Sequence, residues 1–122
     1  MIPLKASEIQ KLLDAQVLCG EGAPDAEILA ACGSDMMSDV LAFHKERMVL
    51  LTGLTNPHVI RTCEMLDVLL IVFVRGKTPG KDVLDMAAER EMVIMTTPYT
   101  LYEACGRLYE KGLPGRQGVD VR

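Results

Sequence analysis

The chain has 122 residues, of which 49% are hydrophobic, and this composition is typical of one folded domain rather than a disordered chain. Its 13 basic and 17 acidic residues give a net charge of −4, which disfavours non-specific binding to nucleic acid. The longest apolar run, residues 68–74, is far shorter than the roughly 20 residues that a membrane helix needs. We therefore expect neither a nucleic acid nor a membrane as partner. The four cysteines show no C-x-x-C spacing, which favours reduced thiols in a cytoplasmic protein.

A helix, a strand and a loop are expected at the start of the chain. Gln10 follows Ser7 by three residues, the spacing of a capping box, so we expect a short helix to begin at Ser7. The apolar run over residues 15–19 predicts a strand, and the glycines and proline of residues 20–24 predict a loop.

A second apolar run covers residues 28–32, and a helix is expected after Gly33, with Ser34 and Asp35 as its caps. The apolar residues of this helix recur at steps of three and four, namely Met36, Met37, Val40, Leu41 and Phe43. The two adjacent methionines either fill the core or mark an adaptable contact surface.

The rest of the chain repeats a strand, a loop and a helix. Strands are expected over residues 48–52, 68–74 and 92–96, and helices over residues 57–66, 79–90 and 98–110. Each helix has a proline in its first turn, and the residues before these prolines, Asn56, Thr78 and Thr97, are expected as N-caps. The strands are continuously apolar, as in parallel sheets buried on both faces. We predict a single layered α/β domain with a mostly parallel sheet flanked by helices, with βα repeats in its C-terminal two-thirds.

Three tyrosines follow one another on the last predicted helix at steps of three and seven: Tyr99, Tyr102 and Tyr109. This spacing predicts a stripe that packs on the sheet with its hydroxyls at the rim. The alternative is that the stripe belongs to a surface for self-association.

The sequence contains none of the common enzyme signatures. It has no G-x-x-x-x-G-K-[ST], no G-x-G-x-x-G and no G-x-S-x-G. Its two histidines, His44 and His58, are fourteen residues apart and lack metal-binding spacing. We therefore expect no catalytic residues, no metal and no cofactor, and no enzymatic activity. The alternative is an accessory activity in phosphoryl transfer.

One region has chemistry suited to a ligand. The loops that follow parallel strands lie at one edge of a sheet, where α/β proteins bind ligands, and the free N–H groups of helix starts favour anions. The candidate residues for a phosphate-bearing small molecule are Ser34, Asp35, Gly53, Thr55, Asn56, Arg61, Arg75, Lys77 and Thr97. The alternative is that the hydroxyl and amide residues are only helix caps and that Gly53 and Gly76 only form turns.

Four segments carry a family resemblance: residues 33–42 (GSDMMSDVLA), 51–62 (LTGLTNPHVIRT), 71–77 (IVFVRGK) and 99–106 (YTLYEACG). With these segments in this order, about residues 5 to 115 resemble the stand-alone DRTGG-domain proteins of anaerobic bacteria. The pentapeptide that names the family does not occur as letters in this chain. The resemblance implies a fold similar to the N-terminal domain of HPr kinase/phosphorylase.

The resemblance also implies a role. Members of the family occur alone, joined to CBS domains in regulatory pyrophosphatases, or joined to phosphotransacetylase domains, where they are accessory, regulatory or dimer-forming modules. We expect residues 1–115 to form one such domain, followed by a flexible tail over residues 116–122. The expected function is a non-catalytic domain that forms a homodimer or docks on a metabolic or signalling enzyme. The alternative is a sensor of a nucleotide or phosphate at the strand ends.

Overall fold

The structure is a computed structural model and describes residues 3–115, so the tail expected over residues 116–122 lies outside the described residues. In chain order the elements are β1 (Leu4–Lys5), α1 (Ala6–Leu12), β2 (Gln16–Cys19), β3 (Glu27–Ile28), β4 (Ala30–Gly33), α2 (Met37–Ala42), β5 (Met48–Thr52), α3 (Pro57–Met65), β6 (Leu70–Phe73), α4 (Lys81–Glu89), β7 (Val93–Thr96) and α5 (Leu101–Glu110).

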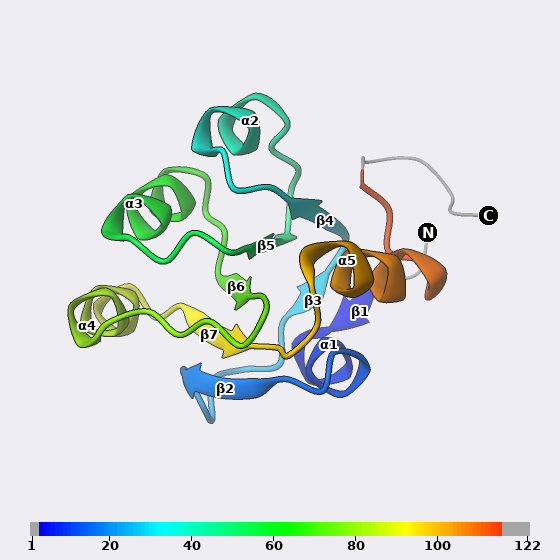
Figure 1. The fold of residues 1–122 in the computed structure, drawn as a ribbon, viewed down its shortest axis with the longest axis horizontal. Coiled ribbons are helices and arrows are strands. Elements are labelled where there is room, and N and C mark those ends of the chain that lie inside the picture. The colour runs from blue at the N-terminus through cyan, green and yellow to red at the C-terminus, as the bar shows by residue number, and fades with distance from the viewer. Residues whose placement is uncertain (1–2, 116–122) are drawn as a thin grey trace.

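The main sheet has five strands in the order β2-β7-β6-β5-β4 (Figure 1). Strands β4 to β7 are parallel, and β2 pairs with β7 in the antiparallel direction at one edge. The predicted α/β class with a mostly parallel sheet is therefore confirmed. A two-stranded antiparallel sheet of β1 and β3, which the sequence analysis did not anticipate, pairs Leu4 with Ile28 beside it.

Helices cover both faces of the sheet, and the alternation of side chains along each strand explains why. On β5, Leu50 enters the core beneath α2, α3 and α4, while Val49 and Leu51 enter the core beneath α1 and α5. All five residues of β5 are buried. Figure 1 shows α2, α3 and α4 side by side along one face and α1 and α5 on the other.

Of the three N-caps predicted before prolines in the βα repeats, only Asn56 is correct. Asn56 caps α3 by accepting a hydrogen bond from the His58 N–H at 3.0 Å, with a proline in the first turn. Helix α4 begins at Lys81 after Gly80, and α5 begins at Leu101 with Thr100 as the cap. The predictions for Thr78 and Thr97 are therefore wrong.

Tertiary contacts explain why α5 begins late. The Thr97 carbonyl accepts from the Gly76 N–H, and the Tyr99 carbonyl accepts from the Arg75 N–H, each at 2.8 Å. These bonds hold the segment after β7 against the loop after β6, so the helix begins only beyond it. The Thr97 hydroxyl donates to the Leu13 carbonyl instead of capping a helix.

The caps expected in the first part of the chain also differ. Helix α1 begins at Ala6, and Glu8 accepts from the Lys5 N–H at 3.0 Å, while the Ser7 hydroxyl donates to Asp25 at 2.6 Å. Helix α2 begins at Met37 without a side-chain cap. Local spacing identified these helices correctly but not the residues that bind their ends.

The expected tyrosine stripe does not pack on the sheet along its length. Tyr99 is half-buried and lies under the Arg107 guanidinium, 4.2 Å from ring centroid to Cζ. In contrast, Tyr102 is 91% exposed and Tyr109 is 54% exposed. The buried face of α5 is formed instead by Ala104 and Leu108.

Gly33 of β4 lies directly against the side chains of α5. A Cβ at this position would lie 2.5 Å from Cys105 Sγ and 3.3 Å from Leu101 Cδ1. We expect Gly33→Ala to lower the free energy of unfolding by about 1–3 kcal/mol, because the half-buried Cys105 side chain or the helix that carries it must shift to make room. Gly106, in the middle of α5, has no atom within 4 Å of its Cβ position, so Gly106→Ala is the matched control.

The control is expected to raise the free energy of unfolding by about 0.5–1 kcal/mol, since alanine loses less backbone freedom in a helix. Urea unfolding followed by circular dichroism measures both variants. Equal stability of the two variants would contradict the close contact at Gly33.

Candidate functional site

The candidate site lies at the carboxyl ends of β4, β5, β6 and β7, which the parallel pairing brings to one edge of the sheet. At its centre is the Asp35 carboxylate. One oxygen, Asp35 Oδ1, accepts from the Gly53 N–H at 2.7 Å and from the Thr52 hydroxyl at 3.0 Å. The Thr52 oxygen in turn accepts from the Leu54 N–H at 3.1 Å. These contacts fasten the entry of α2 to the end of β5.

Arg75 reaches the same place from the loop after β6. A Cβ built on Gly53 would lie 3.0 Å from Arg75 Nη2 and 3.6 Å from each Asp35 carboxylate oxygen. Asp35, Gly53 and Arg75 therefore meet around one point, from the loops after three different strands. Any side chain at Gly53 would push the guanidinium away, so the absence of a Cβ is what allows this approach.

The remaining candidate residues have separate roles. The Ser34 hydroxyl accepts from the Met36 N–H at 3.0 Å within its own turn. Asn56 caps α3, and Thr55 is half-buried beside it. Arg61 is exposed on α3.

The last two candidates lie on the β6–β7 side of this edge. Lys77 is exposed, and its backbone carbonyl accepts from the Thr96 hydroxyl at 2.7 Å. Thr97 is fully buried and its hydroxyl is bound to Leu13, so it is not presented to a ligand in this conformation.

The loops after β6 and β7 are bound to each other. Helix α4, which follows β6, packs on one face of the sheet, and α5, which follows β7, packs on the other. Ligands of α/β proteins often bind between two loops that diverge in this way. Here the Arg75 and Gly76 N–H groups are already bound to the carbonyls of Tyr99 and Thr97. The candidate residues that these bonds leave at the edge are Asp35, Gly53 and Arg75, of which Gly53 is buried and Arg75 is exposed.

Sequence reasoning missed Thr52, which is fully buried and holds both Asp35 and Leu54. The signal was a hydroxyl as the last residue of a buried apolar strand, where a polar side chain needs a partner. The chemistry of the group is a carboxylate held by neutral donors beside a guanidinium. Among residues 3–115, no three His, Cys, Asp or Glu side chains form a group that could hold a metal ion.

Two grooves lie elsewhere on the surface. One, of about 710 Å³, follows the outer side of β4 and is lined by Gly33, Phe43, Lys45 and Gly115 among others. The other, of about 650 Å³, lies at the amino ends of β6 and β7 and is lined by Cys19, Leu69, Arg90 and Met92 among others. Neither groove was anticipated from the sequence, since each combines segments far apart in the chain.

No known protein family and no curated protein matches this chain in sequence. Among solved structures, the chain is similar to the CBS and DRTGG domains of the regulatory region of Clostridium perfringens pyrophosphatase, a complex with the activator diadenosine tetraphosphate. The TM-score is 0.66 at 19% identity, and the match covers 84% of this chain and 45% of that one. The likeness shows a shared, DRTGG-like fold. Within residues 3–115, no helix is long and apolar enough to cross a membrane.

The four cysteines are free thiols, and burial shapes their chemistry. Burial raises the pKa of the Cys63 thiol to about 12, and the neighbouring Cys32 contributes to the rise. Burial also raises the pKa of Cys19, Cys32 and Cys105 above the ordinary value. Because the thiolate is the nucleophile, these cysteines are poorly suited to covalent catalysis at neutral pH.

The raised pKa of Cys63 predicts a loss of stability at high pH. The folded state holds the proton more tightly than the unfolded state, so its contribution is complete below about pH 9 and is lost toward pH 12. Urea unfolding at pH 8 and pH 10.5 should show a smaller loss for Cys63→Ala than for the wild type. Identical losses in both proteins would contradict this contribution.

We also expect Cys63 to stay unreactive toward Ellman's reagent at pH 8 until the protein unfolds.

Proposed function

We propose that the chain is a non-catalytic regulatory domain that acts as a homodimer. Support comes from its likeness to domains of the regulatory region of a pyrophosphatase rather than to a catalytic part. The thiols, whose pKa values are raised by burial, and the carboxylate already engaged by neutral donors also favour binding over catalysis. Docking on a partner enzyme is the alternative form of the same role.

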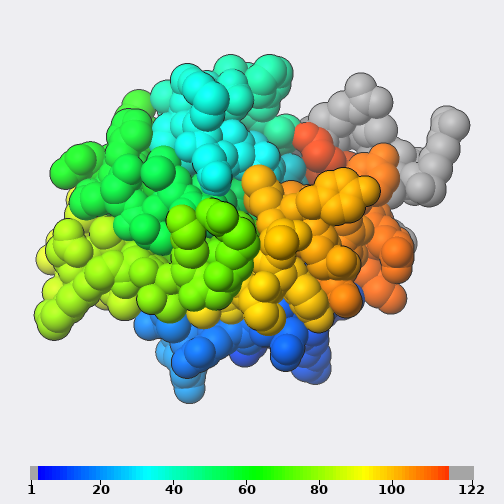
Figure 2. Space-filling view, viewed as in Figure 1, coloured from blue at the N-terminus to red at the C-terminus, as the bar shows by residue number. Residues whose placement is uncertain are grey.

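The observation that carries the dimer is the surface beside β4, which we call the α2 surface: Met36, Leu41 and Phe43. These side chains are 60%, 43% and 62% exposed, although Met37 and Val40 of the same helix are buried. Apolar side chains are therefore exposed on α2 at Leu41 and at both of its ends, at Met36 and Phe43, beside the face that packs on the core. It lies at the rim of the molecule in Figure 2.

The sheet edge next to this surface adds to the argument. β4 pairs with β5 on one side; on its other side the Ala31 N–H donates to the Pro114 carbonyl at 2.9 Å, and the Phe43 side chain lines the groove there. Sheet edges tend to pair with another chain unless they are protected, and Pro114 binds the Ala31 N–H of this edge. A second copy seated here would cover the apolar side chains of α2 and the strand edge together.

Light scattering coupled to size exclusion tests the dimer at high micromolar concentration. The wild type should elute with twice the mass of one chain, and Phe43→Glu should elute as a monomer, because a buried unpaired charge opposes association. Met65→Glu is the matched control, since Met65 is 73% exposed on α3 outside the α2 surface. A monomeric wild type, or a dimeric Phe43→Glu protein, would contradict the proposal.

A second function is favoured by one observation at the carboxyl edge. The Asp35 carboxylate already occupies a position bounded by the Gly53 N–H, the Thr52 hydroxyl and the Arg75 guanidinium. These are groups that bind phosphate oxygens as readily as carboxylate oxygens. We propose that a phosphate-bearing ligand, such as a nucleotide, binds beside Arg75 and displaces Asp35.

A thermal-shift panel of nucleotides, pyrophosphate and acetyl phosphate tests this site. A ligand at a hundred times its Kd adds about 2.7 kcal/mol, and each kcal/mol raises the Tm of such a domain by roughly 4 °C or more. Arg75→Ala should abolish the shift. The control Lys81→Ala removes an exposed cation, already paired with Asp85 at 2.8 Å, and should keep it. A flat panel, or equal shifts in both variants, would contradict the proposal.

A further inference from the structure

The second groove lies at the amino ends of β6 and β7, away from the edge that carries Asp35. One wall is the loop of residues 20–26, and the other contains Leu69, Glu91 and Met92. A neighbouring hollow of about 340 Å³ continues it past Leu69 toward Arg47 and Asp67. Leu69 lines both hollows and is 52% exposed, so an exposed apolar side chain lies where the two hollows adjoin, and we describe them together as one depression.

The lining of this depression, which we call the amino-edge groove, is acidic. Five exposed carboxylates line its two parts: Glu21, Asp25, Glu27, Asp67 and Glu91. Hydrogen bonds from Ser7 hold the pKa of Asp25 below its ordinary value, so this carboxylate is ionised at neutral pH.

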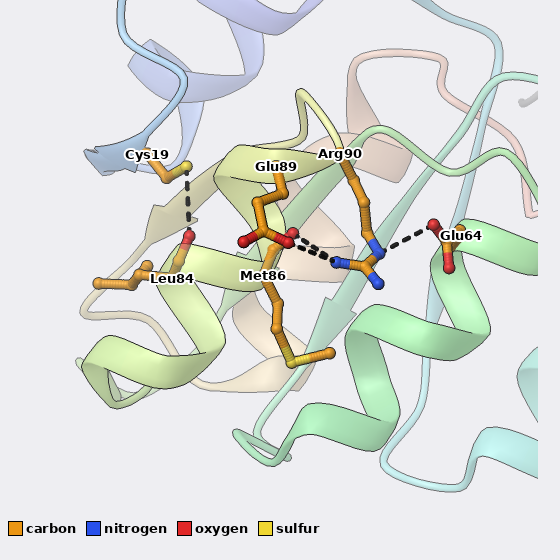
Figure 3. Close-up of polar contacts among 6 residues, drawn as sticks. All are labelled: Cys19, Glu64, Leu84, Met86, Glu89 and Arg90. Atoms are coloured by element: carbon orange, nitrogen blue, oxygen red, sulfur yellow. Dashed lines mark hydrogen bonds and ion pairs between the residues drawn. The ribbon is translucent and has the colours of Figure 1, made fainter.

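The two cations in the lining do not offset this charge. The Arg90 guanidinium is already engaged: Nε lies 2.9 Å from Glu64 Oε2, and Nη1 lies 3.8 Å from Glu89 Oε2 and donates to the Met86 carbonyl at 3.0 Å (Figure 3). Only Arg47 remains to set against five carboxylates. The groove therefore has an apolar centre and a negative rim.

The backbone supports a role for two of these carboxylates. Asp67 follows α3 with φ 56° and Glu91 follows α4 with φ 57°, in the left-handed region that favours glycine. An acidic side chain at the carboxyl end of a helix is also opposed by the helix dipole. Both residues therefore place a negative charge at the groove from a backbone conformation that favours glycine; Asp14, after α1, has the same conformation outside the groove.

We propose that the amino-edge groove binds a basic segment of a partner protein. An apolar side chain of that segment contacts Leu69, and flanking lysine or arginine side chains pair with Glu91 and Asp67. The negative rim favours a cationic partner. The exposed Leu69 adds an apolar contact at one defined place, which attraction by charge alone would not provide. This surface is distinct from the α2 surface, so the proposal stands whether or not the chain dimerises.

Selection of a random heptapeptide library, displayed on phage, against the immobilised full chain tests the proposal. Enriched peptides should carry two or more basic residues around an apolar one. Their affinity, measured by fluorescence anisotropy on synthetic copies, should fall by about tenfold or more in Leu69→Ser and in Glu91→Lys. A steep salt dependence should accompany binding to the wild type.

Two matched controls separate the groove from the net charge and from general apolarity. Glu110→Lys makes the same charge change at an exposed position of α5. Met65→Ser removes an apolar side chain that is 73% exposed and lies outside the groove lining. Both should leave the affinity within about twofold of the wild type. Unfolding curves of all four variants show that each is folded.

Three outcomes would overturn the proposal. One is the absence of enriched peptides, and another is enrichment of acidic or purely apolar ones. The third is an equal loss of affinity in Glu91→Lys and Glu110→Lys, which would mean attraction by the net charge alone. Light scattering of Leu69→Ser distinguishes this result from a failure of the dimer, since the groove variant should retain the oligomeric state of the wild type.

Discussion

The two-sided burial of the central strands is the constraint on which the rest of the structure depends. Successive residues of β5 enter opposite cores, Leu50 on one side and Leu51 on the other, and both are fully buried. Such a strand is stable only when both faces are covered, so the chain must send helices to each side. The buried polar side chains of the strands, Thr52 and Thr96, lie at the carboxyl ends of β5 and β7, and binding chemistry is expected at the ends and edges of the sheet.

At the carboxyl end of the sheet, the fold supplies its own anion. Asp35 takes up the Gly53 N–H and the Thr52 hydroxyl, which would otherwise attract an external anion. The same contact joins the loop before α2 to the end of β5, so the occupant of this position also sets how α2 is held. An entering phosphate would therefore affect the helix whose exposed side chains form the α2 surface, and this gives ligand and assembly a shared structural element.

Much of the fold could be predicted from the sequence, because continuous apolar runs and their spacing reflect burial directly. The strands of the βα repeats and the cap at Asn56 follow from such local signals. The start of α5 could not be predicted, since Thr97 is bound to a carbonyl distant in the chain. For Asp35, Gly53 and Arg75, the sequence predicted only that all three lie at the same edge of the sheet. Their contacts depend on the missing Cβ of Gly53 and on Thr52, which no local pattern singles out.

The hydrogen bond from the Ala31 N–H to the Pro114 carbonyl, 2.9 Å long, has a consequence for synthesis on the ribosome. β4 is an early strand, whereas the residue that shields its outer side lies near the end of the described chain. During translation the sheet can pair β4 with β5 long before Pro114 has left the exit tunnel. Through that interval the strand edge is open to pairing with other nascent chains, and its protection is a late event of biogenesis.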